Sequence, residues 1–232
     1  MGEKIQNTGD SRRIKVFISN SYLDRSIAMK VRNRLGEYGI NVYIAHNERD
    51  VSPLIQEKVL ENISNSTVFV PLLTKNFFSS EWTMQESGAA IALQKGVISV
   101  SIDADPVGFL SRFDSVKTKR EADGSVSGED LSNALLKAMF KRNMIGASEV
   151  IDGLVNAMSL TEANYAAQFL KEIDDAGGID ADSAARLFVG ALDNLMIKGS
   201  FKASKILSDI LLKYKDSLPK ETVELLSQKK IF

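Results

Sequence analysis

The stretch Thr67-Val68-Phe69-Val70-Pro71-Leu72-Leu73 decides the fold of this 232-residue chain. It is a nearly continuous apolar run that is rich in residues favouring β-structure. An apolar run of this length is typical of a parallel strand that helices cover on both faces. We therefore expect a parallel sheet with helices on both sides, in which residues 67–73 form one strand.

Strand and helix patterns alternate on both sides of this stretch. Apolar runs predict further strands at residues 14–18, 41–45 and 97–102, and a weaker run at 114–117 predicts an edge strand. Apolar residues at helical spacing predict helices at about 24–38, 55–63, 80–95 and 131–140. This alternation indicates a doubly wound parallel sheet.

The chain changes character at about residue 147. From there the spacing of apolar residues predicts only helices, at about 147–158, 160–175, 181–197, 200–215 and 219–229. We expect a disordered tail at residues 1–13, an α/β domain at 14–145 and a smaller helical bundle at 146–232. The bundle is assigned an oligomerising or sensing role by elimination, because it contains no acid pair or nucleophile–base pair.

Composition excludes several classes of function. The net charge of −1 gives no electrostatic support for nucleic-acid binding. The chain has no cysteine, and its single histidine is His46, so neither a cysteine-based nor a multi-histidine metal site can form. The polar N-terminus and the short apolar runs predict a cytoplasmic protein without a membrane segment. We expect no metal and no cofactor.

Polar side chains follow three of the expected strands. They are Ser19-Asn20-Ser21, Ala45-His46-Asn47 and Thr74-Lys75. Ligands of open parallel sheets bind at the carboxyl ends of the strands, so these residues are candidates for a ligand cleft. No glycine-rich phosphate loop follows the first strand, which argues against an ordinary dinucleotide-binding dehydrogenase and against a P-loop nucleotidase.

Trp82 and Glu86 lie four residues apart at the start of an expected helix. On a helix they share one face, so an aromatic ring and a carboxylate would both border the cleft. Such a pair suits a sugar nucleotide. The alternative is that Trp82 covers the core and Glu86 is a solvated helix residue. For Asp24 the alternative to a ligand contact is a role as a helix cap, and for His46 the alternative is an ordinary loop residue.

Four ordered motifs resemble those of TIR domains. They are Lys15-Val16-Phe17-Ile18-Ser19 with Asp24, Gly39-Ile40-Asn41-Val42-Tyr43, Ser66-Thr67-Val68-Phe69-Val70-Pro71-Leu72-Leu73-Thr74, and Asn76-Phe77-Phe78-Ser79-Ser80-Glu81-Trp82 ending in Glu86. The last resembles the family signature N-[FY]-x-x-S-x-W-x-x-x-E. The stretch at residues 43–46 is closer to prokaryotic TIR proteins than to receptor or adaptor TIR domains. The resemblance implies a flavodoxin-like fold and does not extend to the helical segment.

The resemblance implies two possible functions. Some TIR domains cleave NAD⁺ with the glutamate of this signature, which is Glu86 here, whereas others are scaffolds that only self-associate. In the enzymatic case the substrate-binding residues would be Ser19, Asn20, Ser21, Asp24, Ala45, His46 and Trp82. A loop at 46–53 would cover the cleft, although Pro53-Leu54 stands where many relatives carry a glycine. Activation by self-association through both domains, and a role in prokaryotic immunity against phage, are implied by the resemblance alone.

One glutamate can suffice for cleavage of NAD⁺. Glycosidases normally need a second carboxyl group to protonate the leaving oxygen, but nicotinamide leaves a cationic pyridinium as a neutral molecule. A carboxylate is needed only to stabilise the developing positive charge on the ribose. Capture by water gives ADP-ribose, and capture by an adenine nitrogen gives a cyclic isomer. The rival hypotheses are a non-catalytic interaction module and an enzyme resembling nucleoside deoxyribosyltransferases, which would form a covalent glycosyl ester.

Overall fold

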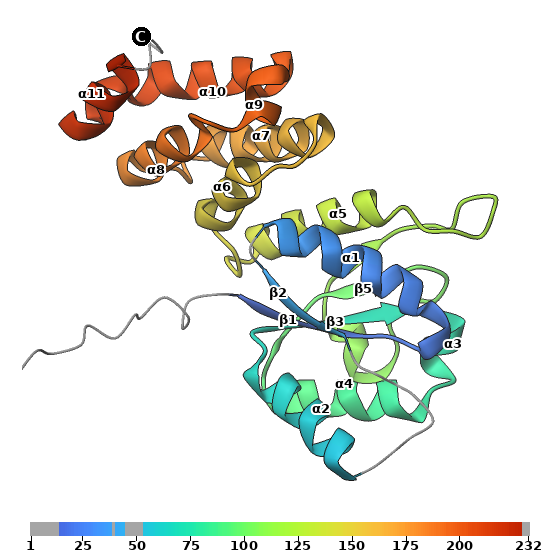
Figure 1. Cartoon of the computed structure of the whole chain (residues 1–232). Helices are drawn as coiled ribbons and strands as arrows, with labels where there is room; N and C mark the ends of the chain where they lie inside the picture. Colours follow the sequence, from blue (N-terminus) through green and yellow to red (C-terminus); the bar gives the residue numbers. More distant parts are fainter. Residues whose placement is uncertain (1–13, 39, 45–52, 229–232) are drawn as a thin grey trace, which may run out of the picture. The chain divides into compact units, whose positions relative to one another are not determined.

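The computed structural model describes residues 14–38, 40–44 and 53–228 of the chain. The contacts between residues divide the chain into two compact units, with the main boundary after Met144 and with Glu37 and Tyr38 grouped with the second unit. The first is an α/β unit and the second is helical, and each is described by itself (Figure 1). The expected tail at residues 1–13 lies outside the described residues.

The α/β unit is built on a six-stranded parallel sheet. Its strands are β1 (Lys15–Ser19), β2 (Asn41–Ile44), β3 (Val68–Leu73), β4 (Gly96–Val97), β5 (Ser99–Ser101) and β6 (Ser115–Lys117). The order is β2-β1-β3-β5-β6, with β4 also paired to β3. This arrangement confirms the expected flavodoxin-like sheet. The strand order reverses between β1 and β3, which is where such sheets bind ligands.

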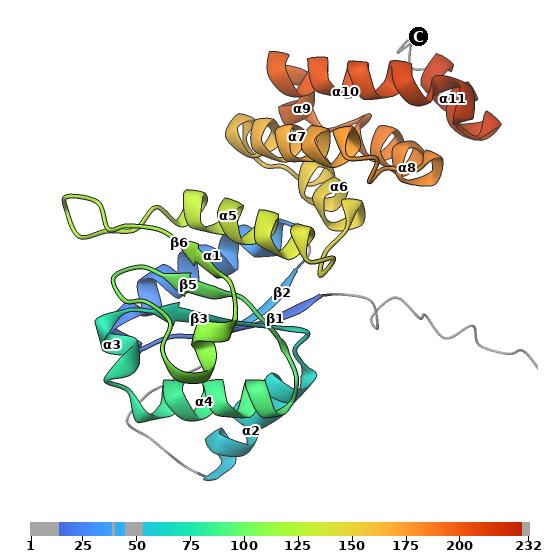
Figure 2. The same ribbon diagram turned by 180° about the vertical axis from the view of Figure 1, so that it is seen from behind.

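Helices cover both faces of this sheet. They are α1 (Arg25–Glu37), α2 (Pro53–Asn65), α3 (Lys75–Phe78), α4 (Glu81–Ala92) and α5 (Gly128–Lys141), with short 3₁₀ turns η1 (Tyr22–Asp24) and η2 (Gly108–Arg112). Figures 1 and 2 show α1 and α5 on one face and α2 and α4 on the other. Every residue of β3 is buried, as expected for a strand covered on both sides.

The main core lies between the sheet and the α2–α4 layer. Phe17 of β1 and Phe69 of β3 stack there with ring centroids 5.6 Å apart, and Ile63 and Phe77 pack into the same buried cluster. Because Phe17 faces this layer, Ser19 two residues later projects from the same face of the sheet. The alternation along β1 therefore directs a polar side chain towards α4 at the end of the strand.

The structure corrects one expected element of the α/β unit and adds another. The fourth strand is not continuous over residues 97–102, because the carbonyl of Val97 accepts a hydrogen bond of 2.7 Å from the Arg142 guanidinium. The helix expected at about 80–95 is confirmed as α4, and the short helix α3 that precedes it was not predicted. Thr74 caps α3 by accepting a hydrogen bond from the backbone N–H of Phe77, and α4 begins only after Ser80.

The helical unit contains α6 (Ala147–Val155), α7 (Leu160–Asp175), α8 (Ala181–Ala191), α9 (Leu195–Gly199), α10 (Phe201–Tyr214), η3 (Lys215–Ser217) and α11 (Lys220–Gln228). Helix α7 packs against both α6 and α10. The prediction of one helix over 181–197 was wrong. Asn194 interrupts it by capping α9 at the N–H groups of Met196 and Ile197, while its amide donates to carbonyls at the end of α6.

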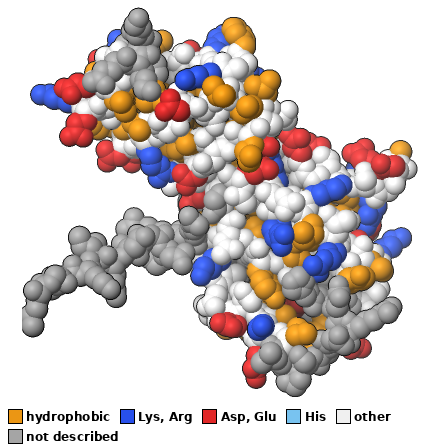
Figure 3. All heavy atoms as spheres, viewed as in Figure 1, with side chains coloured by type: hydrophobic (Ala, Val, Ile, Leu, Met, Phe, Trp, Pro, Cys, Tyr) orange, Lys and Arg blue, Asp and Glu red, His pale blue; other side chains and the backbone are white. Residues whose placement is uncertain are grey.

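The charged surface is mixed in sign. In the view of Figure 3, acidic and basic side chains are interspersed, in keeping with the net charge of −1. Among the described helices, none combines the length and the apolar character needed to span a bilayer.

Candidate active site

Ser19 and Glu86 meet at the carboxyl end of β1. The Ser19 hydroxyl donates a hydrogen bond of 2.5 Å to Oε2 of Glu86, and both side chains are buried. Glu86 lies in the second turn of α4, so this contact joins the switch point of the sheet to the helix that carries the signature glutamate. The other carboxyl oxygen, Oε1, has no hydrogen-bond partner within the described part of the chain. The site therefore holds one oxygen of the acid and leaves the second buried without a partner among the described residues.

Burial dominates the electrostatics of Glu86. Its side chain is only 2% exposed, and the loss of hydration raises the pKa of the carboxyl to about 7. The hydrogen bond from Ser19 acts in the opposite direction by favouring the ionised form. A carboxyl with this pKa exchanges its proton near neutral pH, which is characteristic of functional sites and unusual for a glutamate on a helix surface.

Tyr43 is a neighbour of Glu86 that the sequence reasoning missed. It pairs in register with Phe17, with ring centroids 5.3 Å apart, so it projects from the same sheet face as Ser19. Burial raises the pKa of the Tyr43 phenol, and the negative charge of Glu86 raises it further. The half-buried ring thus lies close enough to Glu86 to sense its charge. The alternation along β1 and β2, read together, would have placed it there.

The remaining residues predicted on β1 and α4 lie near this edge in different settings. The Asn20 side chain is buried and donates to the carbonyl of Ser21, which begins the η1 turn. Trp82 is half-buried and lies one turn before Glu86 on α4. The predictions for Ala45, for His46 and for the loop at 46–53 fall outside the described residues.

Asp24 is part of a polar network that joins several strand ends. Its carboxylate, 3% exposed, accepts hydrogen bonds from Thr74 at 2.6 Å, from Asn76 at 3.3 Å and from Arg120 at 3.2 Å. Arg120 also pairs with Asp103 at 2.8 Å. The network therefore ties the start of α1 to β3, α3 and the segment after β6. These bonds occupy the Asp24 carboxylate, so a substrate contact would have to compete with them.

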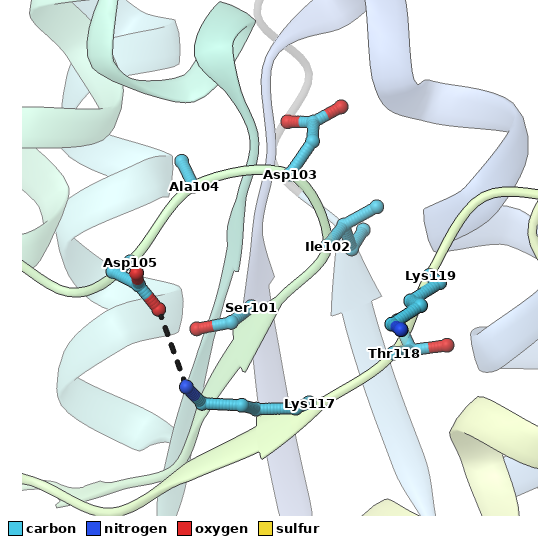
Figure 4. Close-up of a pocket in the computed structure, with 8 residues that line it drawn as sticks. All are labelled: Ser101, Ile102, Asp103, Ala104, Asp105, Lys117, Thr118 and Lys119. Carbon is cyan, nitrogen blue, oxygen red and sulfur yellow. Dashed lines mark ion pairs between the residues drawn. The ribbon is translucent and has the colours of Figure 1, made fainter.

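A hollow opens at the same edge of the sheet, at the ends of β5 and β6. It has a volume of about 300 Å³ and is lined by Ser101, Ile102, Asp103, Ala104, Asp105, Lys117, Thr118 and Lys119. Figure 4 shows Asp103 directed away from the ion pair of Lys117 with Asp105, whose atoms are 3.5 Å apart. Neither Ser19 nor Glu86 lines this hollow. Within the described residues, no cluster of three or more acidic or histidine side chains could hold a metal ion.

These features define a flavodoxin-like α/β protein with a buried carboxyl group at its topological switch point. The sequence profile of the TIR domain matches residues 16–132, which is half of the chain, and the protein belongs to the TIR domain family. A protein of Brachypodium distachyon, "Probable 2' cyclic ADP-D-ribose synthase BdTIR", is 23% identical over 110 residues. That match covers 47% of this chain and 49% of the relative, so the chain spans about half the length of the curated relative.

The network around Asp24 predicts a large loss of stability when its carboxylate is removed. Asp24→Ala leaves the hydroxyl, amide and guanidinium groups that it bound without their acceptor, and we expect the free energy of unfolding to fall by about 3 kcal/mol. Asp105→Ala is the matched control, because Asp105 and Lys117 are 79% and 77% exposed. Asp105→Ala should lower the free energy of unfolding by less than about 0.5 kcal/mol. Urea denaturation measures both, and equal losses would contradict the structural role of Asp24.

The raised pKa of Glu86 predicts a pH-dependent stability. Between about pH 4.5 and pH 7 the unfolded chain ionises this group while the folded chain keeps it protonated. Its contribution to stability is therefore complete below pH 4.5 and is lost as the pH rises to about 7, by roughly 3 kcal/mol. Glu86→Gln should gain stability relative to the wild type across this window, as measured by denaturant unfolding at each pH.

Glu81→Gln, at an exposed glutamate of the same helix, is the control for that comparison. The difference between Glu86→Gln and the wild type should change with pH far more than the difference for Glu81→Gln. If the free energies of unfolding of the wild type, Glu86→Gln and Glu81→Gln changed with pH in parallel, Glu86 would not be held in a poorly hydrated setting.

Proposed function

We propose that this protein is an NAD⁺ glycohydrolase in which Glu86 is the catalytic residue. The observation that carries the proposal is the arrangement of its carboxyl group, which is buried at the switch point of the sheet, held at one oxygen by Ser19 and without a partner at Oε1 among the described residues. The relative from Brachypodium distachyon, whose printed name is that of a cyclic ADP-ribose synthase, supports the same class of substrate.

Glu86 would act as an electrostatic stabiliser in its ionised form. With a pKa of about 7 it is partly protonated at neutral pH in the free protein. A bound nicotinamide riboside carries a positive pyridinium ring, which would favour the carboxylate. As the glycosidic bond breaks, the positive charge moves to the ribose, and a carboxylate in a poorly hydrated site stabilises it more strongly than one in water.

The neighbours of Glu86 would have supporting roles. Ser19 fixes the orientation of the carboxyl group through Oε2, so Oε1 can accept a hydrogen bond from a ribose hydroxyl. The half-buried rings of Tyr43 and Trp82 offer aromatic surface at the same edge, and such surface can contact the nicotinamide or the sugar. Nicotinamide leaves as a neutral molecule, so no acid is needed to protonate it.

The burial of Glu86 also has a consequence for regulation. A carboxyl that is 2% exposed cannot contact a substrate until the surrounding side chains move. We therefore propose that the single chain has low activity and that self-association favours the accessible form. The same burial supports the competing function, a non-catalytic TIR module in which Glu86 only joins α4 to β1. The cytoplasmic location and the role in immunity against phage stay predictions of the sequence.

Glu86→Gln should lower the rate of nicotinamide release by about 10²–10³-fold, because the amide keeps the shape of the side chain and removes its charge. The measurement is incubation of the full chain with NAD⁺ at several protein concentrations, with mass analysis that separates ADP-ribose from its cyclic isomers. Glu81→Gln should retain wild-type activity, and the wild-type rate per chain should rise with protein concentration.

Two outcomes would contradict the proposal. One is full activity in Glu86→Gln. The other is a wild-type chain that neither releases nicotinamide nor binds NAD⁺ at millimolar concentration, which would leave the interaction module as the function. A glycosyl ester trapped on Glu86 would instead indicate the covalent, deoxyribosyltransferase-like mechanism.

A further inference from the structure

The helical unit contains an open groove between α8, α9, α10 and α11. Its volume is about 420 Å³, within the range of small-molecule sites. The groove is lined by Phe188, Ala191, Leu192, Ile197, Lys198, Ser204, Leu207, Ser208, Leu211, Leu212 and Leu226. All of these residues belong to the helical unit, so the groove is independent of the Glu86 site.

The wall of the groove is largely hydrocarbon. Its two serines donate their hydroxyl protons to backbone carbonyls, Ser204 to that of Ile197 on α9 at 2.8 Å and Ser208 to that of Ser204 on α10 at 3.0 Å. Neither hydroxyl therefore has a proton left to offer to a ligand. Leu212 is 65% exposed at the edge of the groove. An apolar ligand would cover such side chains and remove them from water, which is favourable in proportion to the area covered.

Among the described residues that line the groove, Lys198 is the only one with an ionisable side chain. It lies at the end of α9 and is exposed, and no carboxylate pairs with it anywhere in the described ranges. A hydrocarbon groove with one uncompensated cation is complementary to a molecule that joins an aliphatic chain to one negative charge. The cation would remain at the water-facing end of such a complex, where Lys side chains normally hold their ammonium group.

We propose that this groove binds the carboxylate form of a single-chain fatty acid. The chain lies along Leu207 and Leu211, and the carboxylate pairs with Lys198. The size of the groove favours one aliphatic chain over a two-chain lipid. Because the ligand binds only the folded unit, it stabilises that unit by mass action.

The test uses dodecanoate, below the concentration at which it forms micelles, with the full chain in a calorimeter. Dodecanoate should bind and raise the midpoint of thermal unfolding. Across a series of shorter to longer saturated acids, affinity should rise about fourfold for each added methylene group until the groove is filled. Binding should weaken with salt, since the head group interacts with an exposed cation.

Two variants test the two ends of the ligand. Ser208→Trp places a large ring in the groove from an exposed position of α10 and should lower the affinity by about tenfold or more. Ser111→Trp, at an exposed serine of the other unit, is the control for this substitution.

The charged end of the ligand is tested at Lys198. Lys198→Gln should lower the affinity for dodecanoate about three- to fivefold and leave the affinity for the neutral dodecanol unchanged. Lys202→Gln, at an exposed lysine outside the groove, should change neither the affinity for dodecanoate nor the affinity for dodecanol.

No binding of dodecanoate by the wild-type chain would overturn the proposal, as would equal binding by Ser208→Trp. Equal affinities of Lys198→Gln and the wild type for dodecanoate would overturn the pairing with Lys198. Circular dichroism of each variant shows whether it is folded. The result does not depend on NAD⁺ cleavage, so this proposal and the proposed function can fail separately.

Discussion

The hydrogen bond between Ser19 and Glu86 is the contact on which the geometry of the candidate site and its proposed chemistry both depend. It joins residues 67 positions apart, one at the end of β1 and one on α4, and it lies out of contact with water. A buried carboxyl group opposes folding at neutral pH, because its pKa of about 7 means that ionisation has become unfavourable. Proteins tolerate such groups mainly where they have a function.

Most of the α/β unit follows from local sequence patterns, because its strands are short apolar runs and its helices repeat at helical spacing. The differences occur where distant polar side chains decide the outcome. Arg142 interrupts the fourth strand by binding the carbonyl of Val97, and Asn194 divides a helix by binding both α9 and the end of α6. Such contacts depend on the tertiary structure, so a pattern within one segment cannot predict them.

Part of the candidate site was predictable from the sequence, but the contacts within it were not. The strand-end rule and the signature placed Ser19 and Glu86 at the same edge, but neither predicts that one binds the other. Asp24 was expected at a substrate or a helix cap, and the sequence did not predict that its carboxylate binds Thr74, Asn76 and Arg120 from three later segments. The groove beside Lys198 was missed for the same reason, since it exists only where four helices come together.

The pKa of Glu86, measured with and without a substrate analogue, is the sharpest test of a catalytic role for its carboxyl group. Carbon-13 labelling of the glutamate side chains allows the carboxyl resonance of Glu86 to be followed through a pH titration and assigned by its loss in Glu86→Gln. We expect a pKa near 7 in the free protein, and a decrease of about one unit or more when the non-cleavable carba-analogue of NAD⁺ brings its pyridinium charge close. A value near 4.5, or one that the analogue leaves unchanged, would contradict it.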